Sequence, residues 1–82
     1  MKKSIIFSFL ISIALYADDF DSAKKSYNSG QYLDATEFIN LAIQADSTNA
    51  ELHAFASEVF FNLDNLDESY SHIFKAIELD KK

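Results

Sequence analysis

Ala42-Ile43-Gln44-Ala45-Asp46 is followed later in the chain by a similar pentapeptide, Ala76-Ile77-Glu78-Leu79-Asp80. The second copy begins 34 residues after the first, at position 76 instead of position 42. Internal similarity at a period of roughly 20 to 50 residues is typical of supersecondary units that stack on one another. The two pentapeptides therefore predict a chain in which one structural unit occurs twice.

Apolar residues beyond position 18 recur every three or four residues, which is the spacing of an α-helix, and none of these segments alternates as a strand does. Turn-forming residues interrupt this pattern at 28–30, 46–49 and 64–65. We expect Asp18 or Asp19 to cap the first helix. The fold class expected is all-α, with two antiparallel helix hairpins stacked as a short α-solenoid. The four helices are expected at about 20–29, 33–45, 50–63 and 66–79.

Aligning the two copies with an offset of 34 residues places small residues on small ones and large residues on large ones. The aligned pairs are Ala23/Ser57, Tyr27/Phe61, Tyr32/Leu66, Ala35/Ser69, Ile39/Ile73, Ala42/Ala76, Ile43/Ile77 and Asp46/Asp80. This pattern resembles the tetratricopeptide repeat (TPR), with Asp64 standing where the first copy has its turn glycine, Gly30. The resemblance implies one TPR-like domain at 18–82, with repeat one at about 18–49 and repeat two at about 50–82.

The TPR resemblance also implies a concave groove, lined by the first helix of each hairpin, that binds a segment of another polypeptide. Aromatic side chains offer large contact areas in such a groove, and Asn can bond to the main chain of a bound peptide. The alternatives are that Tyr27 and Phe61 pack between the hairpins and that Lys24 and Glu58 are ordinary solvated charges. The residues placed in the groove are Phe20, Lys24, Tyr27, Asn28, Glu51, Glu58, Phe61 and Asn62.

The last expected helix carries an apolar stripe at Tyr70, Ile73, Phe74 and Ile77. Part of the stripe should pack on the preceding helix, and part should face the place where a third repeat would begin. Because stacked arrays need about three repeats to be stable, we expect Tyr70, Phe74 and Ile77 to bind a protein partner, with Phe74 as the anchor. The function expected is a non-enzymatic adaptor for protein–protein interaction. The alternative is a structural subunit or fragment that forms a homo-oligomer through this open C-terminal end, or that caps a larger repeat array.

The N-terminus has the pattern of a secretory signal peptide. Met1-Lys2-Lys3 precedes an apolar run at 5–17, which is shorter than the roughly 20 residues that cross a bilayer as a helix. Cleavage is expected after Ala17, with Ser12/Ala14 as a second site, and the alternative is an uncleaved tether or a buried first helix. We expect residues 1–17 to direct the chain to the bacterial periplasm or the exterior. Membrane contact is then limited to export.

Composition excludes several other functions. The chain of 82 residues has a net charge of −6, which argues against nucleic-acid binding, and it has no Cys for disulfides or thiol chemistry. Without Lys2 and Lys3, the region 18–82 keeps five basic and thirteen acidic side chains, a net charge of −8. His53 and His72 have no recognisable catalytic spacing, so we expect surface or half-buried histidines and no catalytic residue, cofactor or metal. The acidic segment 64–68 is interpreted as a turn and an N-cap.

Overall fold

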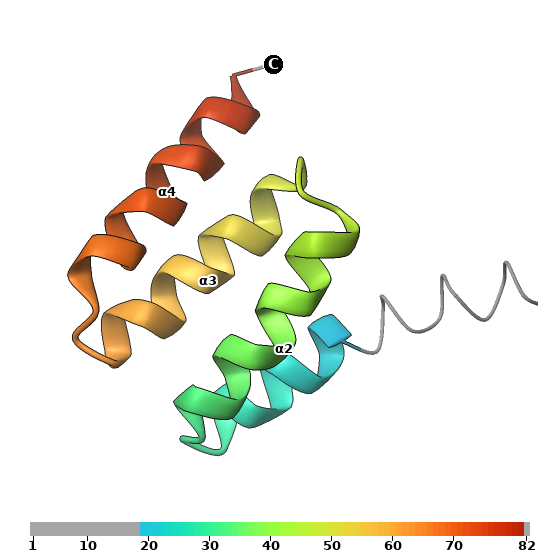
Figure 1. Cartoon of the computed structure of the whole chain (residues 1–82), viewed down its shortest axis with the longest axis vertical. Coiled ribbons are helices and arrows are strands. Elements are labelled where there is room, and N and C mark those ends of the chain that lie inside the picture. Colours follow the sequence, from blue (N-terminus) through green and yellow to red (C-terminus); the bar gives the residue numbers. More distant parts are fainter. Residues whose placement is uncertain (1–18, 82) are drawn as a thin grey trace, which may run out of the picture.

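The computed structural model describes residues 19–81, and this part of the chain is helical and contains no strand (Figure 1). The all-α prediction is therefore confirmed. Residues 19–28 are helical, and they are followed by α2 (Tyr32–Ala45), α3 (Ala50–Asn62) and α4 (Leu66–Asp80). The ends of α2, α3 and α4 lie within one residue of the expected positions. The predictions for the signal peptide at 1–17 and for Asp18 as a cap lie outside the described residues.

The helix α3 lies between α2 and α4 and runs antiparallel to both (Figure 1). The segment 19–28 packs against α2 and α3, since its Ala23 belongs to a buried cluster that both helices share. Phe20 and Phe55 add an edge-to-face aromatic contact at this junction, with ring centroids 5.5 Å apart. No described helix is long and apolar enough to cross a membrane. We call the shared buried residues the core cluster; they are Ala23, Ile39, Ala42, Leu52 and Ala56.

Small residues occupy the places where the helices approach most closely. Ala23 and Ala35 have no exposed surface, and Ala42 and Ala76 are 3% and 6% exposed. Ser57 and Ser69, which align with Ala23 and Ala35, are buried as well. A larger side chain at these six positions would force the helices apart, because protein interiors are close-packed.

The two hairpin turns, at 28–31 and 62–65, share one backbone geometry. Gly30 and Asp64 both have a positive φ, 78° and 60°, which is the left-handed conformation that often follows a helix. A backbone hydrogen bond closes each turn, from Gln31 N–H to Ser26 O at 2.8 Å and from Asn65 N–H to Phe60 O at 3.0 Å. Both atoms of the second bond lie 34 residues after their counterparts in the first. The sequence offset therefore recurs in the hydrogen bonding of the backbone.

Asparagine side chains begin α3 and α4. Asn49 Oδ1 accepts a hydrogen bond from Glu51 N–H at 3.0 Å, and Asn65 Oδ1 accepts one from Glu68 N–H at 3.3 Å. These bonds satisfy backbone donors that have no partner within the first turn of a helix. The interpretation of 64–68 as a turn and an N-cap is therefore confirmed.

Ser57 and Ser69 form the polar part of the α3–α4 contact. The Ser69 hydroxyl donates to the carbonyl oxygen of Ser57 at 2.9 Å, and the two hydroxyl oxygens are 3.2 Å apart. Among the described residues, no buried side-chain nitrogen or oxygen lacks a partner. The first copy achieves the same close approach with Ala23 and Ala35, which carry no hydroxyl and are fully buried.

This difference between the copies gives a prediction. Ser69→Ala alone leaves the buried Ser57 hydroxyl without its neighbour, and we expect it to lower the free energy of unfolding by about 1 kcal/mol. Ser57→Ala together with Ser69→Ala reproduces the alanine pair of the first copy and should restore most of that loss. Urea unfolding followed by circular dichroism measures both variants. A double variant less stable than Ser69→Ala would contradict the interpretation.

Candidate functional site

A polar and aromatic cluster joins the segment 19–28 to α3. The Tyr27 hydroxyl donates a hydrogen bond to the Glu58 carboxylate and accepts one from Asn62 Nδ2 at 3.1 Å. Asn62 Nδ2 also donates to the Glu58 carbonyl oxygen at 2.9 Å. We call Tyr27, Glu58 and Asn62 the Tyr27 cluster. Three of the residues predicted for the groove are thus brought together, and they use their hydrogen-bonding groups on one another.

The charge of Glu58 controls the chemistry of Tyr27. The hydrogen bond to the Glu58 carboxylate raises the pKa of Tyr27 above its ordinary value, and burial and the negative charge of Glu58 act in the same direction. Asn62 opposes this shift because it donates to the phenol oxygen. The phenol therefore keeps its proton at physiological pH and acts as a hydrogen-bond donor.

The Tyr27 ring itself packs between elements. It is half-buried, and its centroid lies 5.4 Å from those of Phe55 and Tyr32. Packing between the hairpins, the alternative considered for Tyr27, thus describes its position. Phe61 is different, because 60% of its surface is exposed and the packing alternative does not hold for it.

The other residues predicted for the groove lie apart from the Tyr27 cluster. The Lys24 ammonium lies 4.2 Å above the ring of half-buried Phe20, and it also pairs with Asp21 at 3.7 Å on the surface. Asn28 is exposed in the last turn of its helix. Glu51 is exposed and lines a shallow hollow between α3 and α4, together with Ala54 and Ile77 among others. These residues offer surface contacts, but no enclosed pocket.

An apolar face covers the outer side of α4. Tyr70, Phe74 and Ile77 are 55%, 66% and 49% exposed, and the rings of Tyr70 and Phe74 lie 6.5 Å apart. Ile73, from the same sequence stripe, is half-buried. We call Tyr70, Phe74 and Ile77 the α4 face. The stripe is thus divided between packing and exposure, as the sequence predicts.

Sequence reasoning did not single out three further exposed leucines. Leu33, Leu41 and Leu66 are 71%, 48% and 44% exposed. Leu33 borders a shallow pocket of about 420 Å³ beside Gly30, Tyr32 and Leu63. Leu33 and Leu41 lie off the buried positions of α2, Ala35, Ile39 and Ala42, and that displacement was the available signal.

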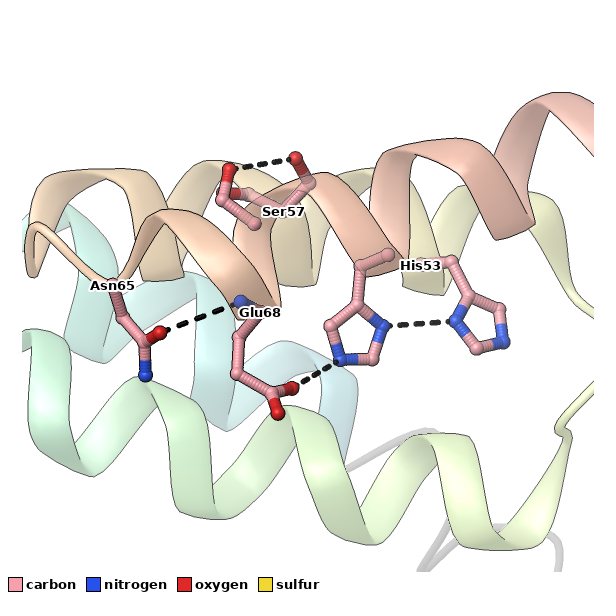
Figure 2. A network of polar contacts seen from close by, with 6 residues as sticks. His53, Ser57, Asn65 and Glu68 are labelled. Atoms are coloured by element: carbon pink, nitrogen blue, oxygen red, sulfur yellow. Dashed lines mark hydrogen bonds and ion pairs between the residues drawn. The ribbon is translucent and has the colours of Figure 1, made fainter.

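A pair of histidines links α3, α4 and the turn before α3. His53 Nδ1 and His72 Nδ1 are 3.0 Å apart, His53 Nε2 lies 2.9 Å from Ser47 O, and His72 Nε2 lies 3.5 Å from the Glu68 carboxylate. Figure 2 shows the contacts from Glu68 through the two imidazoles as one chain. His53 is buried, with 6% of its surface exposed, whereas the sequence suggested a surface or half-buried residue. The two rings form a fixed polar contact between helices.

The environment of His72 disfavours its charged form. Burial lowers the pKa of His72 below its ordinary value, the neighbouring His53 lowers it further, and Glu68 opposes both. The His72 ring also stacks on Phe60, with ring planes 2° from parallel and centroids 5.6 Å apart. Among residues 19–81, no group of three or more His, Cys, Asp or Glu side chains is arranged to hold a metal ion.

The lowered pKa predicts how stability depends on pH. The unfolded chain binds a proton at His72 with a pKa of about 6.5, whereas the folded chain binds it only at lower pH. The contribution of His72 to stability is therefore present above about pH 6.5 and is lost as pH falls toward the folded pKa. Urea unfolding between pH 7.5 and pH 5 in a chelating buffer should show this loss, and His72→Gln should reduce its slope. An unchanged slope in His72→Gln would contradict the assignment.

Comparison with known proteins gives no relative for this chain. No protein-family model, no curated protein and no solved structure matches it. The functional argument therefore rests on the sequence pattern and on the surfaces described above.

Proposed function

We propose that the region 18–82 is a TPR-like, non-enzymatic module that binds other proteins in the bacterial cell envelope. The 34-residue sequence offset and the matching turn hydrogen bonds support a repeated helix hairpin. The buried small residues at equivalent places support close stacking of the two hairpins. The proposal includes the α-solenoid arrangement and a binding role without catalysis.

The observation that carries the binding role is the α4 face. Its three large apolar side chains are each about half exposed or more, and they lie on one side of one helix. Contiguous apolar surface on a small protein marks an interaction site, and aromatic side chains are common anchors in such sites. Phe74, the most exposed of the three, is the anchor in this proposal.

The groove on the first helix of each hairpin is the second contact of the proposal. Its exposed residues are Phe61, Asn28 and Glu51, whereas Tyr27, Glu58 and Asn62 already bond to one another. A bound segment would therefore meet the Phe61 ring first, and the Tyr27 cluster would act as a fixed wall. The acidic charge of the region, −8 for residues 18–82, favours a partner with a basic rim.

The proposed location rests on the N-terminal pattern of two lysines, an apolar run and Ala17. Export with cleavage requires that the protein recovered from its host start near Asp18. Intact-mass measurement of that protein tests the proposal. A chain that begins at Met1 would contradict export with cleavage and leave the binding proposal untouched.

A second candidate function is self-assembly through the α4 face. A patch that lies along one helix can pair with the same patch of a second copy about a two-fold axis. In this candidate the chain is a structural subunit or caps a larger repeat array. Sedimentation over a range of concentrations separates the two candidates, because only self-assembly makes the apparent mass rise with concentration without any partner.

The binding proposal is tested by capture from an envelope extract with Phe74→Asp as the decisive variant. We expect this change to weaken capture of a specific protein about tenfold or more, because it places a charge in the centre of an apolar contact. Leu33→Asp is the matched control: it puts the same charge on an equally exposed residue of α2, away from the α4 face. Circular dichroism confirms that both variants keep their helices.

The same capture experiment assigns the groove. Phe61→Ala should weaken binding if the partner also enters the groove, and it should leave binding unchanged if the α4 face acts alone. Equal losses in Phe74→Asp and Leu33→Asp would sink the role of the α4 face.

A further inference from the structure

The hydrogen-bond partners of the two histidines fix where their protons are. Ser47 O is a carbonyl oxygen and the Glu68 side chain is a carboxylate, so both can only accept. Each therefore calls for a proton on the Nε2 atom that faces it. With both outer nitrogens protonated, the Nδ1 lone pairs of His53 and His72 face each other across 3.0 Å. Two lone pairs at this distance repel unless a cation lies between them.

The distance between the nitrogens suits a metal ion as well as a shared proton. First-row metals lie about 2.0–2.1 Å from imidazole nitrogens, so a separation of 3.0 Å corresponds to an N–metal–N angle of roughly 94°. Tetrahedral coordination would need a separation of about 3.3 Å at the same bond lengths. An angle near a right angle is the geometry of square-planar or tetragonal sites, which Cu²⁺ and Ni²⁺ prefer.

The surroundings hold both rings in the orientation that a metal requires. Imidazole ligands commonly donate their other N–H to a backbone carbonyl or a carboxylate, and here His53 faces Ser47 O and His72 faces Glu68 (Figure 2). The Phe60 ring, stacked on His72, limits rotation of that imidazole. The ligand pair therefore comes from two packed helices, with each ring held at its second nitrogen.

Space for further ligands lies beside the pair. A hollow of about 340 Å³ is bordered by both histidines, Ser71, Lys75 and Glu78, among others. Water molecules in this hollow would complete the coordination of a metal. The nearby Lys75 ammonium is 3.3 Å from the Glu78 carboxylate, which offsets its charge.

We propose that His53 and His72 form a two-histidine site for a divalent first-row transition ion, Ni²⁺ or Cu²⁺ by its geometry, with water as the remaining ligands. Because only two side chains bind the ion, the affinity is expected to be micromolar. The site does not depend on the proposed binding function, since none of its ligands belongs to the α4 face. Metal binding would brace the α3–α4 hairpin at the end where α3 begins.

The test is a calorimetric titration of NiCl₂ into the protein as purified from its host, at pH 7.5 in a weakly coordinating buffer. We expect one ion per chain. His72→Gln should weaken binding at least tenfold, and Glu68→Ala should weaken it by about 10–100-fold although Glu68 does not touch the ion. Glu37→Ala, which removes an exposed carboxylate of α2, is the control and should leave the affinity unchanged.

A second measurement does not depend on any variant. In NMR spectra of the unaltered protein, the first equivalent of paramagnetic Ni²⁺ should broaden the ring signals of His53 and His72 together. Broadening of surface carboxylates first would overturn the proposal, as would equal affinity in His72→Gln and the unaltered protein. Absence of binding below millimolar Ni²⁺ and Cu²⁺ would also overturn it and leave a shared proton as the only cation.

Discussion

Replacing Ile39 with Ala is expected to lower the free energy of unfolding by about 2–5 kcal/mol. Ile39 has no exposed surface, and it is one of the two largest fully buried side chains among the described residues, the other being Val59. It lies in the core cluster, where α2 meets the segment 19–28 and α3. The truncation leaves a cavity at the junction of three helical segments.

The effect should be large enough to unfold much of the protein. Native domains are stable by only about 5–15 kcal/mol, and small domains lie at the low end because they bury less of their surface. Urea unfolding followed by circular dichroism measures the loss.

Leu41→Ala is the matched control for Ile39→Ala. It truncates a residue of the same helix that is 48% exposed, so we expect a change of about 0.5 kcal/mol or less. Similar losses in the two variants would mean that α2 does not use its Ile39 side for the core. The comparison therefore tests the orientation of α2 and not only the presence of a helix.

The helices were predictable because their determinants are local. Asn49 and Asn65 cap α3 and α4 through bonds to residues two and three positions away, and such bonds can be read from a short window of sequence. Gly30 indicated the first turn for the same reason. Asp64 was a weaker signal, because a residue with a Cβ adopts a positive φ at a cost of roughly 1–2 kcal/mol.

The contacts between helices were not predictable in the same way. Tyr27 and Asn62 are 35 residues apart, and His53 and His72 are 19 residues apart. Whether such residues meet depends on the rotation of each helix about its own axis, and the apolar periodicity fixes that rotation only coarsely. The α4 face was predicted because one helix contains all of it, whereas the histidine pair needs two helices in register.

The second large effect is expected from Ala56→Leu, which should lower the free energy of unfolding by about 2–3 kcal/mol. Ala56 is fully buried on α3, in the same cluster as Ala23 of the segment 19–28 and Ala42 of α2. Three added carbons have no space there, so the side chain or the helices must move. Because the cluster joins the first hairpin to the second, this position reports on stacking between the hairpins.

Ala54→Leu separates that effect from any change in helix propensity. Ala54 lies on α3 as well, but it is exposed beside the shallow hollow between α3 and α4, where a larger side chain fills open space. We expect its free energy of unfolding to stay within about 0.5 kcal/mol of the unaltered protein. If Ala56→Leu proved as harmless as Ala54→Leu, the hairpins would not be closely packed, and the groove between their first helices would lose its physical basis. A loss confined to Ala56→Leu requires close packing at that junction, which is the packing that a stacked helical repeat needs.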